Sequence, residues 1–75
     1  MYQLTDDQRK RLENDFIYHK PIEDQVPRYE SIRARAKDYA EFLITMCPPS
    51  REPSLALTHL EECVMYANAS IARNE

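Results

Sequence analysis

Tyr18 is the aromatic residue in this chain best placed to bind a nucleobase. It lies in residues 16–21, FIYHKP, where β-branched and aromatic residues and the closing proline favour an extended backbone. An aromatic ring on such a segment can stack on a base, which contributes about 1–3 kcal/mol. Alternatively, Tyr18 fixes this arm to the rest of the chain. The residues alone favour the second interpretation.

Arg33 and Lys37 are a pair of cations that could bind phosphate. They are four residues apart, so a helix would place both on one face. Two cations at the edge of an interface suit phosphate groups. A solvated charged flank with ion pairs to Asp38 and Glu41 explains the same residues, and the residues alone favour it.

The histidines and cysteines do not form a catalytic or metal-binding set. His19 and His59 are far apart and lack Asp or Cys partners at metal-ligand spacing. Cys47 and Cys63 have no nearby His or Asn to generate a thiolate, and the chain has no Gly for a phosphate-binding loop. If helices flank the turn after Cys47, the two thiols are about 18 Å apart, beyond the ~7 Å limit for a disulfide. We therefore expect no metal, no cofactor, no disulfide and no enzymatic activity.

Length and charge narrow the function further. The 75 residues make one domain (1–75) at most, near the lower limit for a self-sufficient core. The net charge of −3 disfavours non-specific binding to DNA or RNA polymers. No apolar run reaches the ~18 residues of a membrane span, so we expect a soluble cytosolic protein that does not bind membranes.

The chain is predicted to be all-α. Residues 27–47 carry an apolar stripe at three-four spacing, and Pro48-Pro49 ends that helix. Residues 50–74 form a second helix capped by Ser50, and so short a turn makes the two antiparallel neighbours. Residues 1–22 form a short helix to about Asp15, begun by a capping box at Thr5, and then an extended arm. The stripe of the first long helix is Tyr29, Ile32, Ala36, Tyr39, Leu43 and Met46; Ala40, Phe42, Ile44 and Cys47 widen it.

The last helix indicates that the chain assembles. Its stripe is Leu57, Leu60, Val64, Ala67 and Ile71, and its middle, residues 63–67, is apolar on nearly every side. A helix that is apolar all round must be covered all round, and this chain is too short to do so. We predict a compact homo-oligomer built on the hairpin.

Two stretches together resemble a known family. They are FIYHKP (16–21) and a hairpin that reads YESIRARAK (29–37) and then CPPSREPSLALTHLEECVMYANASIARNE (47–75). They look like the phage-encoded anti-CBASS sponges, which sequester the cyclic-nucleotide signals of bacterial immunity. The C-terminal hairpin of those proteins is shared with anti-Thoeris sponges. Residues 1–15 match nothing in this pattern and are interpreted as an extension.

The resemblance implies a non-enzymatic binder in the cytoplasm of the infected host. It implies a hexamer of two interlocked trimers that holds cyclic dinucleotides in pockets between subunits. Tyr18, His19, Arg33 and Lys37 would bind that ligand. Arg73, which the helix dipole alone would explain, and Arg35 would form a separate cyclic-trinucleotide site on the threefold axis.

Two other functions stay open on the sequence. The hairpin could be a protein–protein interaction module with no small-molecule ligand. Its apolar faces would then bind another protein. It could also hydrolyse the messenger, although the chain lacks the residues for a phosphodiesterase site.

Overall fold

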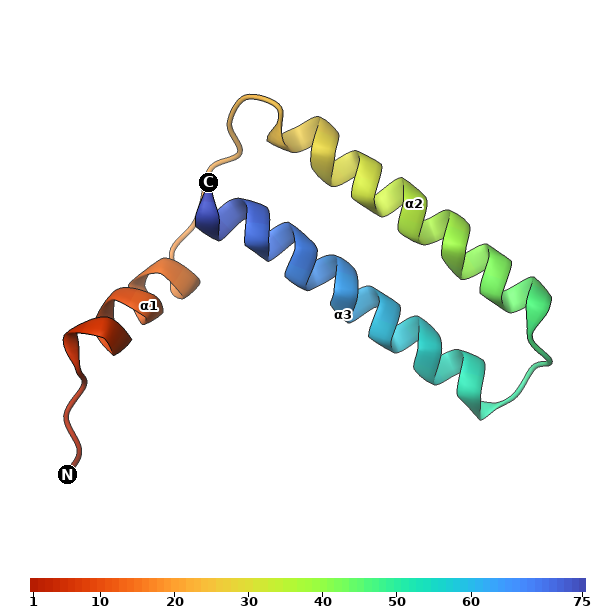
Figure 1. Ribbon diagram of the computed structural model, residues 1–75, viewed down its shortest axis with the longest axis horizontal. Coiled ribbons are helices and arrows are strands. Elements are labelled where there is room, and N and C mark those ends of the chain that lie inside the picture. The colour runs from red at the N-terminus through yellow and green to blue at the C-terminus, as the bar shows by residue number, and fades with distance from the viewer.

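The computed structural model describes residues 1–75 and contains three helices and no strand. The helices are α1 (Asp6–Phe16), α2 (Gln25–Met46) and α3 (Arg51–Asn74). In Figure 1, α2 and α3 run side by side in opposite directions, and α1 projects from the open end of this hairpin near the end of α3. The all-α class predicted from the sequence is confirmed. The homo-oligomer stays a prediction.

The capping box at the start of α1 forms as the sequence predicts. The Gln8 amide donates to the Thr5 hydroxyl oxygen at 3.1 Å, and the Thr5 amide donates to the Gln8 side-chain oxygen at 3.0 Å. The helix has 11 residues and buries none of them. α1 is thus held by its own cap and a few polar contacts, not by a core.

α2 begins at Gln25, two residues before the predicted start at Pro27. A tight turn precedes it: Ile22 donates its amide to the Gln25 side-chain oxygen at 3.1 Å, and the Gln25 amide donates to the Ile22 carbonyl at 3.0 Å. Glu23 in this turn has a positive φ of 47°. Pro27 fits within the first helical turn, where no intrahelical donor is lost.

α3 begins at Arg51, so Ser50 holds the N-cap position that was predicted. Its side chain does not cap the helix, however. The Ser50 hydroxyl donates to the Pro48 carbonyl at 3.2 Å, within the turn between the helices. The expected cap hydrogen bond is therefore wrong: no first-turn amide donates to the Ser50 hydroxyl oxygen, and the hydroxyl is engaged with the turn instead.

The predicted stripe of α3 faces α2: its first four residues are half-buried and Ile71 is 8% exposed. The predicted stripe of α2 needs a correction. Tyr39 and Met46 are 53% and 66% exposed, whereas Ala40 and Cys47 are half-buried. After Ala36 the next half-buried residue is Ala40, four positions on, and not Tyr39, three positions on. Tyr39 and Met46 therefore face away from α3.

One chain covers little of its own apolar surface. Its extents are 49 × 39 × 13 Å, and only Gln25 and Ile71 are buried. The radius of gyration is 16.9 Å, against about 11 Å for a compact domain of this length. The accessible area is 6754 Å², whereas a folded monomer of this mass exposes about 4,800 Å². The excess is of the order of a stable protein–protein interface.

Two further features bear on function. Both cysteines are free. None of the three helices has the length and the apolar character needed to cross a membrane.

Candidate functional site

The arm that follows α1 helps to form a pocket over the open end of the hairpin. This arm pocket has a volume of about 530 Å³ and takes its walls from the end of α1, the arm, α2 and the last turns of α3. Its polar and aromatic lining residues are Asp15, Tyr18, His19, Tyr29, Arg33, Asn68 and Arg73. Three of the four residues predicted to hold a cyclic dinucleotide, Tyr18, His19 and Arg33, therefore line one pocket.

Tyr18 and Arg33 are free to bind a ligand in this pocket. Tyr18 is 83% exposed, so its ring is not fixed against the hairpin as the alternative interpretation required. Arg33 makes no ion pair, and neither does Lys37. The ion pairs to Asp38 and Glu41 that would have explained these cations structurally do not form. A guanidinium without a protein anion is suited to phosphate.

His19 has a structural partner. Its Nε2 atom lies 2.7 Å from the carbonyl oxygen of Asn14. This contact folds the arm back on the last turn of α1. The other ring nitrogen is not engaged by any hydrogen bond and is available to a ligand.

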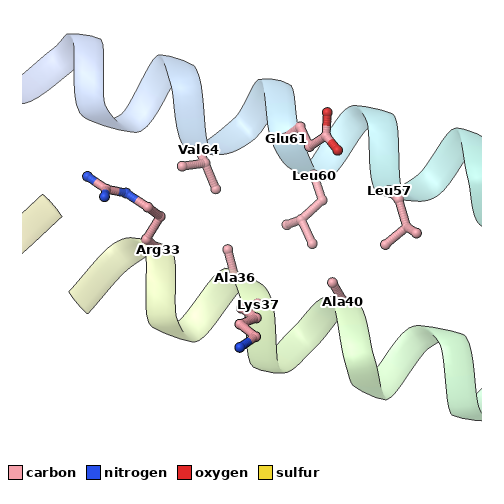
Figure 2. A pocket seen from close by; sticks show the side chains of 8 residues that line it. All are labelled: Arg33, Ala36, Lys37, Ala40, Leu57, Leu60, Glu61 and Val64. Atoms are coloured by element: carbon pink, nitrogen blue, oxygen red, sulfur yellow. The ribbon is translucent and has the colours of Figure 1, made fainter. Parts of the chain in front are cut away.

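Lys37 lies in a different pocket, which we name the seam pocket because it lies between α2 and α3. Its volume is about 350 Å³, and Arg33 lines both pockets. Figure 2 shows Ala36 and Ala40 on α2 facing Leu57, Leu60 and Val64 on α3. The small alanines leave a gap that aliphatic side chains line. Since it has no aromatic ring, this pocket is the weaker candidate for a nucleotide.

Arg73 lines the arm pocket together with Tyr18 and Arg33. The family resemblance implies a separate site for Arg73 with Arg35, which lines none of the pockets. Within one chain, then, Arg73 and Arg35 are not brought together. The threefold-axis site stays a prediction about an assembly.

Asn68 is a lining residue that the sequence analysis missed. Its Oδ1 atom is buried and has no hydrogen-bond partner, and it is the only buried side-chain polar atom in that condition. A buried acceptor without a partner costs about 1–3 kcal/mol. The available signal was a polar residue inside an otherwise apolar stretch of α3, which does not distinguish a site residue from a surface one.

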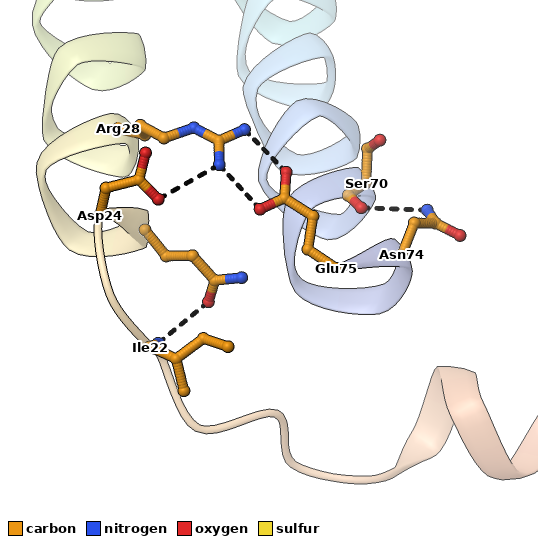
Figure 3. A network of polar contacts seen from close by, with 7 residues as sticks. Ile22, Asp24, Arg28, Ser70, Asn74 and Glu75 are labelled. Carbon is orange, nitrogen blue, oxygen red and sulfur yellow. Dashed lines mark hydrogen bonds and ion pairs between the residues drawn. The ribbon is translucent and has the colours of Figure 1, made fainter.

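An ion pair beside the arm pocket holds the two long helices together at the open end of the hairpin. Arg28 on α2 donates two hydrogen bonds of 2.7 Å to the side-chain carboxylate of Glu75, which follows α3 (Figure 3). Asp24 lies 3.6 Å from the same guanidinium. The hydrogen bonds from Arg28 lower the pKa of the Glu75 carboxyl, and those to Glu75 raise the pKa of Arg28. This pair joins the first turn of α2 to the residue that follows α3.

No group of three or more His, Cys, Asp or Glu side chains is arranged to hold a metal ion. Of the two cysteines, Cys63 is exposed on α3 and Cys47 is half-buried directly after the last residue of α2. The arm pocket is lined by two phenol rings, two guanidinium groups, an imidazole, an amide and a carboxylate.

Comparison with known proteins identifies the family. The family model described as "Acb2/Tad1, hairpin domain" matches residues 8–72. No curated protein and no solved structure matches the chain. The match begins at Gln8, so most of α1 belongs to the family region, and the expectation that residues 1–15 are an extension is wrong for residues 8–15. The chain is a member of the Acb2/Tad1 hairpin family of anti-CBASS and anti-Thoeris sponges.

Proposed function

We propose that this protein binds cyclic dinucleotides and sequesters them without cleaving them, and so blocks CBASS signalling in the host cytoplasm. The observation that carries the proposal is that a member of a sponge family gathers Tyr18 and Arg33 in one open pocket. The messenger would be kept from its effector by stoichiometric capture, which requires tight binding but no chemistry.

The chemistry of the arm pocket supports this ligand class. The exposed ring of Tyr18 offers a stacking surface for one base. Arg33 has no competing carboxylate, and so it supplies a cation for a phosphate. His19 contributes a ring nitrogen beside them. Lys37 would act only at the edge of the site, since it lines the seam pocket on the far side of Arg33.

Assembly is part of the same proposal. One chain leaves the arm pocket open and exposes large apolar side chains on both long helices, among them Phe42 and Met65. We propose that other copies cover these surfaces and close the pocket, with six copies as the number that the family resemblance implies. A cyclic-trinucleotide site at Arg73 and Arg35 would need the threefold axis of that assembly.

A second candidate function is a hairpin that binds another protein. The exposed pair Tyr39 and Phe42, whose rings stack with centroids 6.2 Å apart, favours it because exposed aromatic residues often mark interfaces. Copies of the same chain would cover Tyr39 and Phe42 equally well. The exposed pair therefore supports a protein-binding hairpin less strongly than the arm pocket supports a sponge.

One experiment separates these functions. The protein is incubated with cyclic di-AMP and passed over a gel-filtration column, and the nucleotides of the unbound fraction and of the heat-denatured protein fraction are both analysed by chromatography. A sponge releases intact cyclic di-AMP. Linear product would show an enzyme, and no retained nucleotide would leave the protein-binding module.

A further inference from the structure

One of the two guanidinium groups in the arm pocket is already paired with an anion of the chain itself. The Nη1 atom of Arg73 lies 3.8 Å from the Oδ1 atom of Asp15, and its Nη2 atom donates to the Asp15 carbonyl oxygen at 3.4 Å. Both residues line the arm pocket. Arg33, by contrast, faces the pocket with no ion pair. The site therefore contains a free cation, a paired cation and a carboxylate.

The contact between Asp15 and Arg73 also attaches α1 to the hairpin. One further hydrogen bond, from the Asn14 side-chain amide to the Arg73 carbonyl oxygen at 3.2 Å, joins the two helices. Every polar contact between α1 and α3 thus involves Arg73, and α1 buries none of its residues. Two of these three contacts use the Arg73 guanidinium, so what that group binds affects how firmly α1 is held.

The pairing is open to exchange. The Arg73 Nη1 and Asp15 Oδ1 atoms are 3.8 Å apart, whereas a good charge-assisted hydrogen bond has a length of ~2.7–2.9 Å. The pair formed by Arg28 and Glu75 does reach that length, at 2.7 Å. A phosphate that entered the pocket would also lie close to the Asp15 carboxylate, and two like charges within about 4–6 Å destabilise each other. Phosphate and carboxylate therefore compete for Arg73.

We propose that Asp15 is a built-in competitor that weakens binding of the anionic ligand and couples that binding to release of α1. A phosphate takes the place of the carboxylate at the Arg73 guanidinium, and the end of α1 then keeps only the hydrogen bond from Asn14 to the main chain of Arg73. By thermodynamic linkage, whatever loosens α1 from Arg73 strengthens ligand binding by the same factor. This inference rests on the proposed function and names the residue that sets the affinity of the same site.

The first test is Asp15→Asn, which keeps the shape and removes the charge. Because an exposed ion pair is modest in strength, calorimetric titration with cyclic di-AMP at low salt should show affinity raised about two- to fivefold. The gain should shrink at high salt, which screens the competing charge. The matched control is Asp7→Asn, the same change on the same helix but outside every pocket, and it should leave the affinity unchanged.

The second test needs no variant. Hydrogen exchange of the α1 amides is measured in the parent with and without saturating cyclic di-AMP, and residues 10–16 should exchange faster when the ligand is bound. Slower exchange of these amides on binding, or an Asp15→Asn protein that binds no more tightly than the parent, would overturn the inference while leaving the sponge intact. A parent that binds no cyclic di-AMP would overturn both.

Discussion

Arg28 and Glu75 join the first turn of α2 to the end of α3 through two nitrogen–oxygen contacts, each of 2.7 Å. These residues are 47 positions apart, yet they form the shortest ion pair in the chain. Their pairing closes the open end of the hairpin next to the arm pocket. It therefore links the stability of the hairpin to the geometry of the candidate site.

The first prediction concerns the pH dependence of this pair. Because the pKa of Glu75 is lowered in the folded state, its stabilising effect is fully present above the ordinary glutamate pKa of about 4.3. It is lost as the pH falls through the lowered pKa. Urea unfolding should show Glu75→Gln to be slightly less stable than the parent at pH 7 and equal to it at pH 2. Glu62→Gln, outside this network, is the control. A difference that persisted at pH 2 would mean that the variant acts through something other than charge.

The second prediction is that Tyr18 binds the ligand by stacking. Tyr18→Ala should weaken cyclic di-AMP binding by about 1–3 kcal/mol, roughly 5- to 150-fold. The loss should be similar at low and high salt, because stacking does not depend on screened charge. Tyr18→Phe keeps the ring and should bind as the parent does. A Phe variant as weak as the Ala variant would point to the hydroxyl instead of the ring.

The third prediction is that Arg33 binds phosphate. Arg33→Ala should weaken binding more at low salt than at high salt, since the lost contact is electrostatic. Arg35→Ala is a matched control: it removes the same charge from the same helix at a residue that lines none of the pockets. The two variants should differ by tenfold or more at low salt. Equal losses would show only a general effect of net charge.

The fourth prediction concerns Asn68. Because its Oδ1 atom is buried without a partner, Asn68→Leu should raise the stability of the ligand-free protein by about 1 kcal/mol. If a ligand supplies the missing donor, the same variant should bind cyclic di-AMP at least fivefold more weakly. Asn74→Leu is the control on the same helix. A variant that bound normally would assign Asn68 to packing alone.

The fifth prediction is assembly. Light scattering should give a mass several times the 8.9 kDa of one chain. Phe42→Glu, at an exposed apolar position, should dissociate the assembly while circular dichroism still shows helix. Ala67→Glu should instead disrupt the hairpin, because Ala67 is half-buried against α2 and an uncompensated charge there costs several kcal/mol. A monodisperse parent monomer at micromolar concentration would refute the assembly.

The helices could be predicted because local signals mark them. The capping box at Thr5, the Pro48-Pro49 break and the three-four spacing from Leu57 to Ile71 each act over a few residues. The start of α2 was missed because it depends on a side chain, that of Gln25, which closes a turn with Ile22. The spacing predicts the wrong face for Tyr39. After Ala36, a step of three leads to Tyr39 and a step of four leads to Ala40, and both steps fit an apolar stripe on a helix.

The candidate site stays a prediction. Residue type alone favours structural roles for Tyr18 and Arg33, and the family resemblance is what assigns them to a ligand. The position of Arg73 in the same pocket depends on how the end of α3 meets the end of α1. The two residues that meet there, Asp15 and Arg73, are 58 positions apart in the sequence. Spacing along the chain carries no information about such a contact. Asn68 was missed for the same reason, since burial of its oxygen depends on the neighbouring helix.

Calorimetric titration of cyclic di-AMP into the parent and into the Tyr18→Ala/Arg33→Ala double variant tests the central claim most directly. Light scattering on the same samples serves as the control for assembly. The account predicts saturable binding by the parent, and a double variant that stays assembled but loses at least 100-fold in affinity. A double variant that stays assembled and binds as tightly as the parent would contradict the assignment of the site to the arm pocket.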